Sequence, residues 1–298
     1  IKEMKTLLRK HQSNIALVIG NGINRYDPAK ATNSWDDLLV KLAEKHLQEQ
    51  FHSVPNGVAL TEFYDILELK FQKSISKKSL PQEFCDLMES WKCYEHHMRI
   101  VKWAQEADAP ILTTNFEQVL SDAGKCTLYR TKKSGFTDYY PWETYFGSKE
   151  ISDPSQEFGI WHVNGMQRYS RSIRLGLTHY MGSVERARGW LLKGNERRLF
   201  SGKNDLDWDG AAFWLHIVFN TPLLIFGLSL EENEVFFRWL LIERARYFKI
   251  FPERRKSAWY INVRELNNYG KQLFLERVGV QPISVASFDE IYGAETWS

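Results

Sequence analysis

Four short segments place glycines or polar residues directly after apolar runs. They are Gly20-Asn21-Gly22-Ile23-Asn24-Arg25, Thr113-Thr114-Asn115-Phe116-Glu117, Trp161-His162-Val163-Asn164-Gly165 and Gly227-Leu228-Ser229-Leu230. Backbone amides beside glycine can bind a phosphate, and an asparagine amide can hold a ribose hydroxyl or a water. A histidine with its ordinary pKa of about 6.5 can act as a general base at neutral pH. Together these residue types predict a site that binds phosphate and sugar and moves a proton.

The first two segments also have plainer interpretations. The Rossmann fingerprint requires a third glycine where this chain has Arg25, so Gly20 and Gly22 are equally typical of an ordinary turn after a strand. Threonine and asparagine commonly begin helices, so Thr114 and Asn115 are also consistent with a helix N-cap. Each of these two segments, taken alone, therefore leaves its function open.

The other two segments are similarly ambiguous. A solitary histidine is more often structural than catalytic, although strand alternation would place His162 and Asn164 on one face, pointing into one pocket. Gly227 allows close contact and Ser229 can bind a phosphate or ribose, but the same residues also form routine turns. The order of all four segments along the chain carries more information than any one of them.

The elements that must position these residues alternate between strands and helices. Residues 2–11 predict a helix, residues 14–20 a buried strand, and Ser34 the N-cap of a helix that follows. Further strands are expected at 109–115, 158–165, 221–230, 257–263 and 281–287, and a long helix at 231–248. We therefore expect one α/β domain over residues 1–298, a Rossmann-like parallel sheet flanked by helices, with an inserted helical lobe at 51–107. In such sheets ligands bind at the carboxyl ends of the strands.

Composition limits the function classes. The 298 residues include 39 basic and 37 acidic side chains, a net charge of +2 that predicts no direct nucleic-acid binding. We found no apolar run of about 18 residues and no signal-peptide core, so we expect a cytoplasmic protein without membrane association. Cys85, Cys93 and Cys126 form no C-x-x-C pair, which argues against a zinc site and against a disulfide framework.

In this order the four segments resemble the sirtuin-like NAD-binding family. GNGIN stands where that family has its G-A-G-I-S type loop, TTNFE where it has T-T-N-[FY]-D, WHVNG where it has a strand ending in H-G, and FGLSL where it has G-[TYF]-S-L. The resemblance covers residues 15–248. It implies a Rossmann-like sheet that binds NAD, with Asn115 on the nicotinamide ribose or the attacking water and a histidine as base.

The sequence departs from the family pattern at two points. The family's catalytic histidine directly precedes the glycine, and Asn164 occupies that position here, so either His162 is the base or catalysis is impaired. Deacetylating sirtuins carry a four-cysteine zinc module, which this chain lacks. The resemblance is therefore closest to bacterial antiphage effectors, and it implies an NAD glycohydrolase, a homo-oligomer activated by a separate sensor such as a HerA-type ATPase or a short Argonaute. The alternative is a non-catalytic module that senses NAD or another nucleotide.

The resemblance also assigns roles to individual residues. Catalytic roles fall to Asn115, His162 and Asn164. Contacts with NAD are expected from Gly20, Asn21, Gly22, Asn24, Arg25, Thr114, Gly227, Leu228 and Ser229, with the first five on the pyrophosphate and with Gly227 and Ser229 toward the adenosine. No metal ligand is expected.

Overall fold

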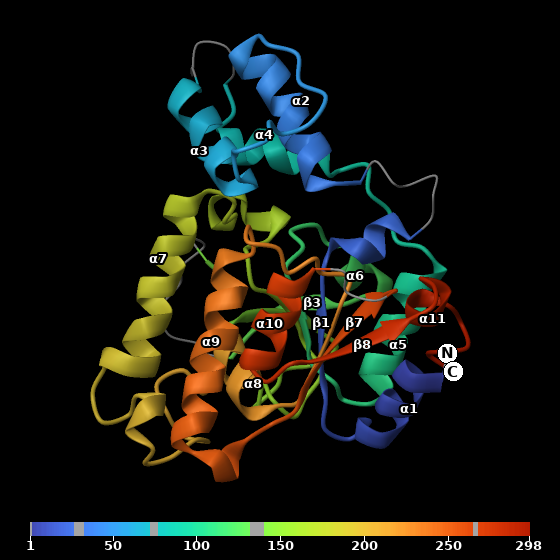
Figure 1. Cartoon of the computed structure of the whole chain (residues 1–298), viewed down its shortest axis with the longest axis vertical. Helices are drawn as coiled ribbons and strands as arrows, with labels where there is room; N and C mark the ends of the chain where they lie inside the picture. The colour runs from blue at the N-terminus through green and yellow to red at the C-terminus, as the bar shows by residue number, and fades with distance from the viewer. Residues whose placement is uncertain (1, 27–32, 72–76, 132–139, 265–267) are drawn as a thin grey trace.

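Strands and helices alternate along most of the chain in the computed structural model, which describes residues 2–26, 33–71, 77–131, 140–264 and 268–298 (Figure 1). Residues 27–32 of the loop after the first strand, and residues 72–76 of the expected lobe, lie outside the described residues. The strands are β1 Ala16–Ile19, β2 Ile111–Thr113, β3 Thr127–Arg130, β4 Thr144–Gly147, β5 Ile160–His162, β6 Leu223–Phe226, β7 Ala258–Val263 and β8 Gln281–Val285.

The helices flank these strands or form a separate lobe. The α-helices are α1 Lys2–His11, α2 Trp35–Leu47, α3 Leu60–Lys70, α4 Leu80–Leu87, α5 Glu95–Glu106, α6 Val119–Ala123, α7 Leu177–Arg188, α8 Trp214–Asn220, α9 Val235–Ile250, α10 Tyr269–Arg277 and α11 Asp289–Tyr292. Two 3-10 helices matter for the site, η1 Asn21–Arg25 and η3 Gln167–Ser172. None of the helices in the described part of the chain combines the length and apolar character needed to cross a membrane.

The sheet has the strand order β3-β4-β5-β2-β1-β6-β7-β8. Strands β5, β2, β1, β6, β7 and β8 pair in parallel, whereas β3 and β4 are antiparallel additions at one edge. Counted along the chain, the parallel strands lie in the order 3-2-1-4-5-6, which is the Rossmann order. The predicted α/β, Rossmann-like class is therefore confirmed, and the strand order reverses between β1 and β6.

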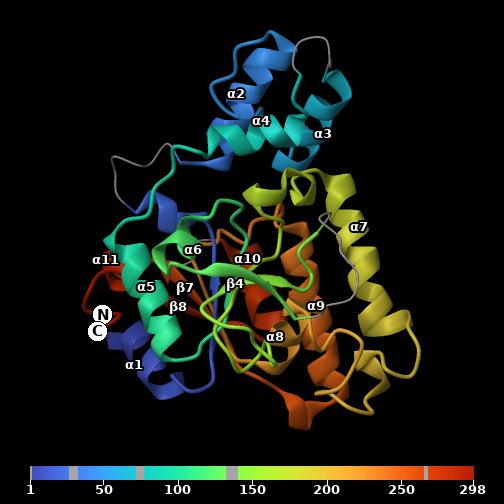
Figure 2. The ribbon, with the colours of Figure 1, turned by 180° about the vertical axis from the view of Figure 1, so that it is seen from behind.

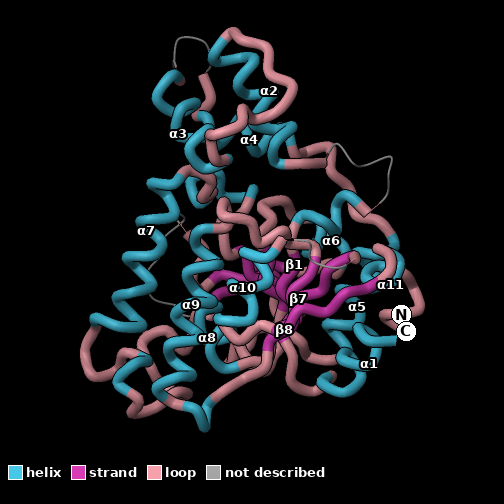
Figure 3. The backbone as a smooth tube through the Cα atoms, viewed as in Figure 1, coloured by secondary structure: helices cyan, strands magenta, loops and turns pink. Residues whose placement is uncertain are grey.

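Both faces of the sheet are buried, as expected for parallel strands (Figure 3). Alternate residues of β1 point to opposite sides, so that Val18 joins the cluster under α7, α8 and α9, and Leu17 and Ile19 join the cluster under α1 and α5. The near-continuous apolar character of the strands follows from this two-sided burial. Figure 2 shows the same layers from behind.

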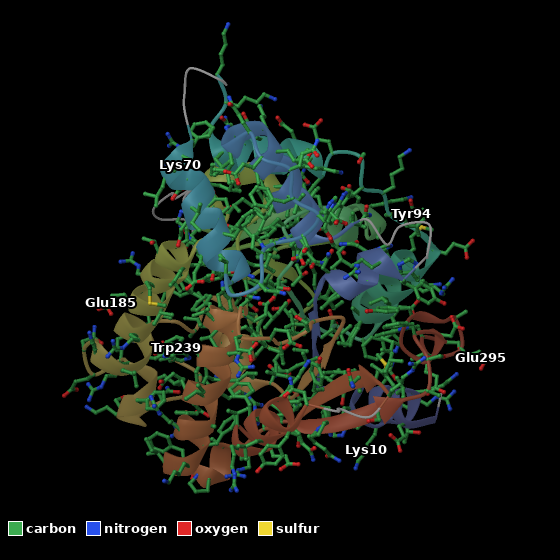
Figure 4. All side chains as sticks on the ribbon, turned by 45° about the horizontal axis from the view of Figure 1, so that its top comes forward. Lys10, Lys70, Tyr94, Glu185, Trp239 and Glu295 are labelled. Carbon is green, nitrogen blue, oxygen red and sulfur yellow. The ribbon has the colours of Figure 1, made fainter. Side chains whose placement is uncertain are left out.

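Helices α2, α3 and α4 form a lobe above the sheet, and their apolar cluster also includes Phe116, Ile173 and Leu175 of the main body (Figure 1). The bounds differ from the predicted 51–107. Helix α2 belongs to the lobe because Leu38, Leu39 and Leu42 pack in its cluster, whereas α5 belongs to the main body because Ile100 and Val101 pack against the sheet. Figure 4 labels Lys70 at the end of α3 in the lobe and Tyr94 directly before α5.

The two ends of the chain lie together on the side of the main body that carries α1 and α11 (Figure 1). The ammonium group of Lys5 donates hydrogen bonds to the carbonyl of Glu295, at 2.5 Å, and to the hydroxyl of Ser298, at 2.8 Å. The rings of Trp103 and Trp297 also meet edge to face, with centroids 5.5 Å apart. The first and last helices are thereby held against the same face of the sheet.

Candidate functional site

The four predicted segments meet where the parallel strands end, along the side of the sheet that we call the carboxyl edge. Ile19, Thr113 and His162 are register partners on the adjacent strands β1, β2 and β5, and Phe226 of β6 pairs with Ile19 on the other side. The segments that follow these residues therefore leave four neighbouring strands at the same level. This edge includes the point between β1 and β6 where the strand order reverses, which is the usual ligand crevice of such sheets.

The glycines of the first and fourth segments pack against each other. A Cβ atom added to Gly20 would lie 2.4 Å from the carbonyl oxygen of Gly227, and the amide of Gly22 donates a 2.8 Å hydrogen bond to that oxygen. The hydroxyl of Tyr292 lies just above, 2.9 Å from a Cβ built on Gly22 and 2.6 Å from one built on Gly227. Any larger residue at Gly20 or Gly22 would force the two loops apart, so contact between the loops explains these glycines before any ligand is considered.

A buried chain of hydrogen bonds ties the first segment to the second. The amide nitrogen of Asn24 donates to Glu117 at 2.8 Å and to the side chain of Asn21 at 2.9 Å. His97 receives a 3.1 Å hydrogen bond from the backbone of Tyr94 at Nδ1, so its Nε2 proton is free to donate to Asn24 at 3.1 Å. This arrangement fixes the amide of Asn24 with its nitrogen toward the carboxyl group.

Glu117 titrates close to neutral pH. Burial raises the pKa of Glu117 to about 7, although the hydrogen bond from Asn24 opposes that rise. One carboxyl oxygen is bonded to Asn24, and the other, Oε2, is buried without a partner of hydrogen-bond geometry among the described residues, although the side chain of Asn115 and the backbone of Phe116 lie near enough to the carboxyl group to favour its ionised form. Glu117 can therefore take up or release a proton at neutral pH, and one of its oxygens is available to a further partner.

Asn115 and His162 are joined, but both are closed off from solvent. Nδ1 of His162 donates a 2.7 Å hydrogen bond to the backbone carbonyl of Asn115, which leaves Nε2 as an acceptor without a partner among the described residues. Burial lowers the pKa of His162 to about 4, so the ring is neutral at pH 7 and a weak base. The side-chain oxygen of Asn115 is also buried and unpaired in the described structure.

The side chains of Asn164 and His162 lie in different surroundings. Strand β5 ends at His162, and Asn164 follows in a turn, where it lines a cavity of about 40 Å³ beneath the lobe together with Thr114 and Glu234. His162 is not among the residues that line this cavity, and its ring instead meets Phe146 edge to face. The expectation that both residues point into one pocket was wrong, because the alternation of a strand does not continue into a turn.

The small cavity carries a second carboxyl group that titrates near neutrality. Burial raises the pKa of Glu234, directly before α9, to about 7. Trp35 and Leu60 of the lobe form the roof. The space corresponds to about one water molecule, since each water in the liquid occupies about 30 Å³. A dinucleotide does not fit the cavity in this closed arrangement.

Of the nine predicted NAD contacts, Thr114 alone lines this cavity, and the other eight lie outside it. Arg25 is exposed at the end of η1, and Ser229 is exposed beyond β6. Leu228 is buried in the core, and its carbonyl accepts a 2.8 Å hydrogen bond from Tyr260. Arg25 and Ser229 are therefore accessible to a ligand from outside, whereas the side chain of Leu228 contributes to packing.

The structure adds site residues that the sequence interpretation missed. Glu117 was part of a quoted segment but received no role, and Glu234, His97 and Tyr292 were not singled out. The acidic residue closing TTNFE was an available signal for Glu117, whereas nothing local marked the other three. Tyr292 comes from α11 near the end of the chain, and its buried hydroxyl has no hydrogen-bond partner among the described residues.

Thiols and metal ligands do not contribute to this site. All three cysteines are free, and burial raises the pKa of the Cys85 thiol to about 12 and that of Cys126 to about 11. Within the described residues no group of three or more His, Cys, Asp or Glu side chains is placed to hold a metal ion.

No model of a known protein family matches the sequence, and no curated protein matches it. The geometry of the site therefore carries the functional argument.

Proposed function

We propose that this chain binds NAD at the carboxyl edge of the sheet and hydrolyses its bond to nicotinamide. NAD and water would give nicotinamide, ADP-ribose and a proton. The observation that carries the proposal is a group of buried polar atoms without partners among the described residues, on Asn115, Glu117 and Tyr292, at the point where a Rossmann-ordered sheet reverses its strand order. Buried polar groups are rarely left unpaired, so this cluster favours a polar ligand at this edge.

The lobe must move for NAD to enter. Ligand pockets of this kind usually measure about 300–1,000 Å³, far more than the cavity of about 40 Å³ beneath the lobe. Polar contacts between the lobe and the body include the amide of Leu60 on Asn233, at 3.0 Å, and the amide of Leu177 on Asp65, also at 3.0 Å. Opening also separates apolar contacts, because Phe116, Ile173 and Leu175 of the main body pack in the lobe cluster, so the closed lobe is a gate that needs a trigger to open.

The chemistry needs a stabilised positive charge and a proton acceptor. Water attacks C1′ of the nicotinamide ribose while the bond to the ring nitrogen breaks, and the attacking water loses its proton. An acidic, water-poor site favours the positive charge that develops on the sugar. Ionised Glu117 supplies a compensating negative charge beside Asn115. Glu234 faces the cavity with a pKa near neutrality, so it is better matched to accept the proton than His162 with its pKa of about 4.

Gating gives the activity a biological setting. An unrestrained NAD hydrolase would kill its own cell, and a site closed by a lobe supports activity only after a trigger. By resemblance we place the chain among cytoplasmic antiviral defence effectors of bacteria, as a homo-oligomer opened by a separate sensor such as a HerA-type ATPase or a short Argonaute. The trigger would act by separating the lobe from α7 and α9.

A sensing module that binds NAD without cleaving it is the second candidate. It is favoured by Asn164, which cannot accept a proton near neutral pH, and by the burial of His162. In this case the lobe would report occupancy by opening and closing, and the nicotinamide bond would survive.

One set of measurements separates these functions. The purified chain is mixed with NAD, binding is followed by calorimetry and free nicotinamide by chromatography, with and without the activating partner. We expect nicotinamide release by the chain and its loss in Asn115→Ala, with Asn195→Ala in an exposed loop as the matched control. Binding without release identifies the sensing module. Absence of NAD binding in every condition would contradict both candidate functions, the hydrolase and the sensing module.

A further inference from the structure

A second, larger cavity lies at the opposite end of the parallel strands, where β7 and β8 begin, along the side of the sheet that we call the amino edge. It measures about 780 Å³ and is enclosed by the second half of α9, the end of α10 and the segments that lead into β7 and β8. Figure 1 shows α9 and α10 next to each other in front of the sheet. None of the four segments that predicted the carboxyl-edge site contributes to this cavity.

The walls of this cavity are strongly basic. Six cationic side chains line it against a single carboxyl group, that of Glu276; the cations are Arg244, Arg246, Lys249, Arg255, Lys256 and Arg277. The whole chain has almost equal numbers of basic and acidic residues, 39 and 37, so this is a local concentration of positive charge. Of the six, Arg246 is paired with Glu243 at 2.5 Å. The remaining excess favours an anion with more than one charge.

Arg244 places a buried cation in the wall. Its side chain is 1% exposed, and burial lowers its pKa to about 9, which leaves the guanidinium charged at neutral pH. It donates hydrogen bonds to the backbone carbonyls of Val218, at 2.8 Å, and Lys256, at 2.9 Å, and none of its hydrogen bonds to described residues is to a carboxylate. A buried charge that meets only neutral acceptors is costly. A bound anion would compensate it.

The cavity also has an apolar part. Phe248, Phe274 and Val278 line it alongside the cations, and the guanidinium of Arg244 lies 4.6 Å from the centre of the Phe248 ring. Its volume is within the range of sites for cofactors and small molecules. Charged and apolar walls together match a ligand that has phosphate groups at one end and an apolar ring at the other.

We propose that this cavity is a binding site for a phosphorylated small molecule of nucleotide size. The phosphates contact the guanidinium groups of the exposed Arg255 and Arg277, whose planar forks suit phosphate oxygens, while the buried Arg244 adds positive charge behind them. The organic ring lies against the half-buried Phe274. The parallel strands separate this site from the carboxyl edge, so it can be occupied independently of NAD.

The test uses the full chain and ligands of defined charge. Calorimetric titration is carried out with inorganic tripolyphosphate, ATP and adenosine. We expect tripolyphosphate and ATP to bind, ATP more tightly than tripolyphosphate, and adenosine to bind most weakly. Replacing both Arg255 and Arg277, in Arg255→Gln/Arg277→Gln, removes two charge-assisted contacts and should weaken ATP binding about a hundredfold or more. The matched control, Lys41→Gln/Lys102→Gln, neutralises two exposed lysines on α2 and α5 and should bind normally.

Each other outcome counts against the site. Unchanged ATP affinity in Arg255→Gln/Arg277→Gln, or equal loss in the control, overturns the assignment. Absence of binding to tripolyphosphate and to ATP overturns it as well, and binding of duplex DNA without binding of either phosphate ligand would make the cavity a surface for a macromolecule. Asn115→Ala should leave ATP binding at this cavity unchanged, so failure of the NAD proposal and failure of this one are distinguishable.

Discussion

The two edges of the sheet differ in almost every property that makes a binding site. The carboxyl edge is covered by the lobe, encloses about 40 Å³ and contains buried acidic and amide groups. The amino edge is not covered by the lobe, and its cavity measures about 780 Å³ and is lined by cations. One edge is therefore suited to a positive charge that develops on a sugar, and the other to phosphate groups.

The contrast also shows what sequence patterns detect. Each segment at the carboxyl edge is contiguous, so glycines and polar residues stand next to one another in the sequence. The cations of the amino edge come from α9, from the segment before β7 and from α10, and in each place they resemble ordinary surface charges. A site assembled from separate segments leaves no local signal.

The largest effect is expected from a test of the contact between loops at the carboxyl edge. Gly20→Ala should lower the free energy of unfolding by about 3 kcal/mol or more, because the added Cβ meets backbone atoms that have no room to move. Gly182→Ala in α7 is the control, since a Cβ there meets nothing within 4 Å and alanine favours a helix by about 1 kcal/mol. Urea denaturation measures both. Equal midpoints for Gly20→Ala and the wild type would show that the loops can separate freely.

The raised pKa of Glu117 at the carboxyl edge predicts that the free energy of unfolding depends on pH. Because the folded pKa of Glu117, about 7, exceeds its unfolded value of 4.5, the folded state binds this proton more tightly. The associated stability is fully present below pH 4.5 and is lost as pH rises through 7. Glu117→Gln should therefore match the wild type near pH 4.5 and exceed it by on the order of 3 kcal/mol at pH 8.

Urea denaturation at several pH values tests this, with the exposed Glu49→Gln as the control. A difference between Glu117→Gln and the wild type that stays constant from pH 4.5 to pH 8 would contradict the raised pKa.

Asn164→His tests whether a histidine base at the carboxyl edge adds to the proton transfer assigned to Glu234. A histidine at this position would line the cavity that also contains Glu234, and general-base catalysis typically contributes about a hundredfold in rate. We expect nicotinamide release to rise by roughly that factor, and His162→Ala to have a smaller effect. Asn195→His serves as the control, and all variants are assayed with and without a candidate sensor protein. Strong hydrolysis by the unaltered chain that His162→Ala abolishes would reverse this assignment.

The smallest effect is expected on the free energy of unfolding, from repulsion among the cations at the amino edge. Like charges around the cavity repel one another, so Arg255→Gln/Arg277→Gln should stabilise the ligand-free chain by about 0.5 kcal/mol at low salt. The gain should shrink as salt screens the charges. Thermal unfolding at low and high ionic strength measures it, and a gain that salt leaves unchanged would point to a cause other than repulsion.

Much of the fold was predictable because its signals are local. The predicted N-terminal helix has the bounds Lys2–His11, and the side chain of Ser34 accepts a 3.1 Å hydrogen bond from the backbone of Asp37, as an N-cap should. The lobe bounds were not predictable, because an amphipathic helix shows that it packs but not against which cluster. The antiparallel strands β3 and β4 were missed, and β3 is mostly exposed or half-buried, without a run of buried residues.

The candidate site was predictable only in part. The neighbouring positions of the four segments follow from strands that end at one edge, and the register confirms them. The separation of His162 from Asn164 depends on where β5 ends, which is uncertain by a residue or two from sequence. The partners of Glu117 are Asn24 and, through it, His97, and these contacts join distant parts of the chain.

The meeting of the two chain ends has a consequence for experiments on the lobe. Lys5 bonds to Glu295 and Ser298, so labels attached to either end start from the same patch, beside α1 and α11 and away from α2, α3 and α4. A fluorophore at either end is thus a fixed reference point on the main body. Paired with a second fluorophore on an exposed lobe residue such as Glu49, it turns lobe opening into a distance that energy transfer can follow in real time.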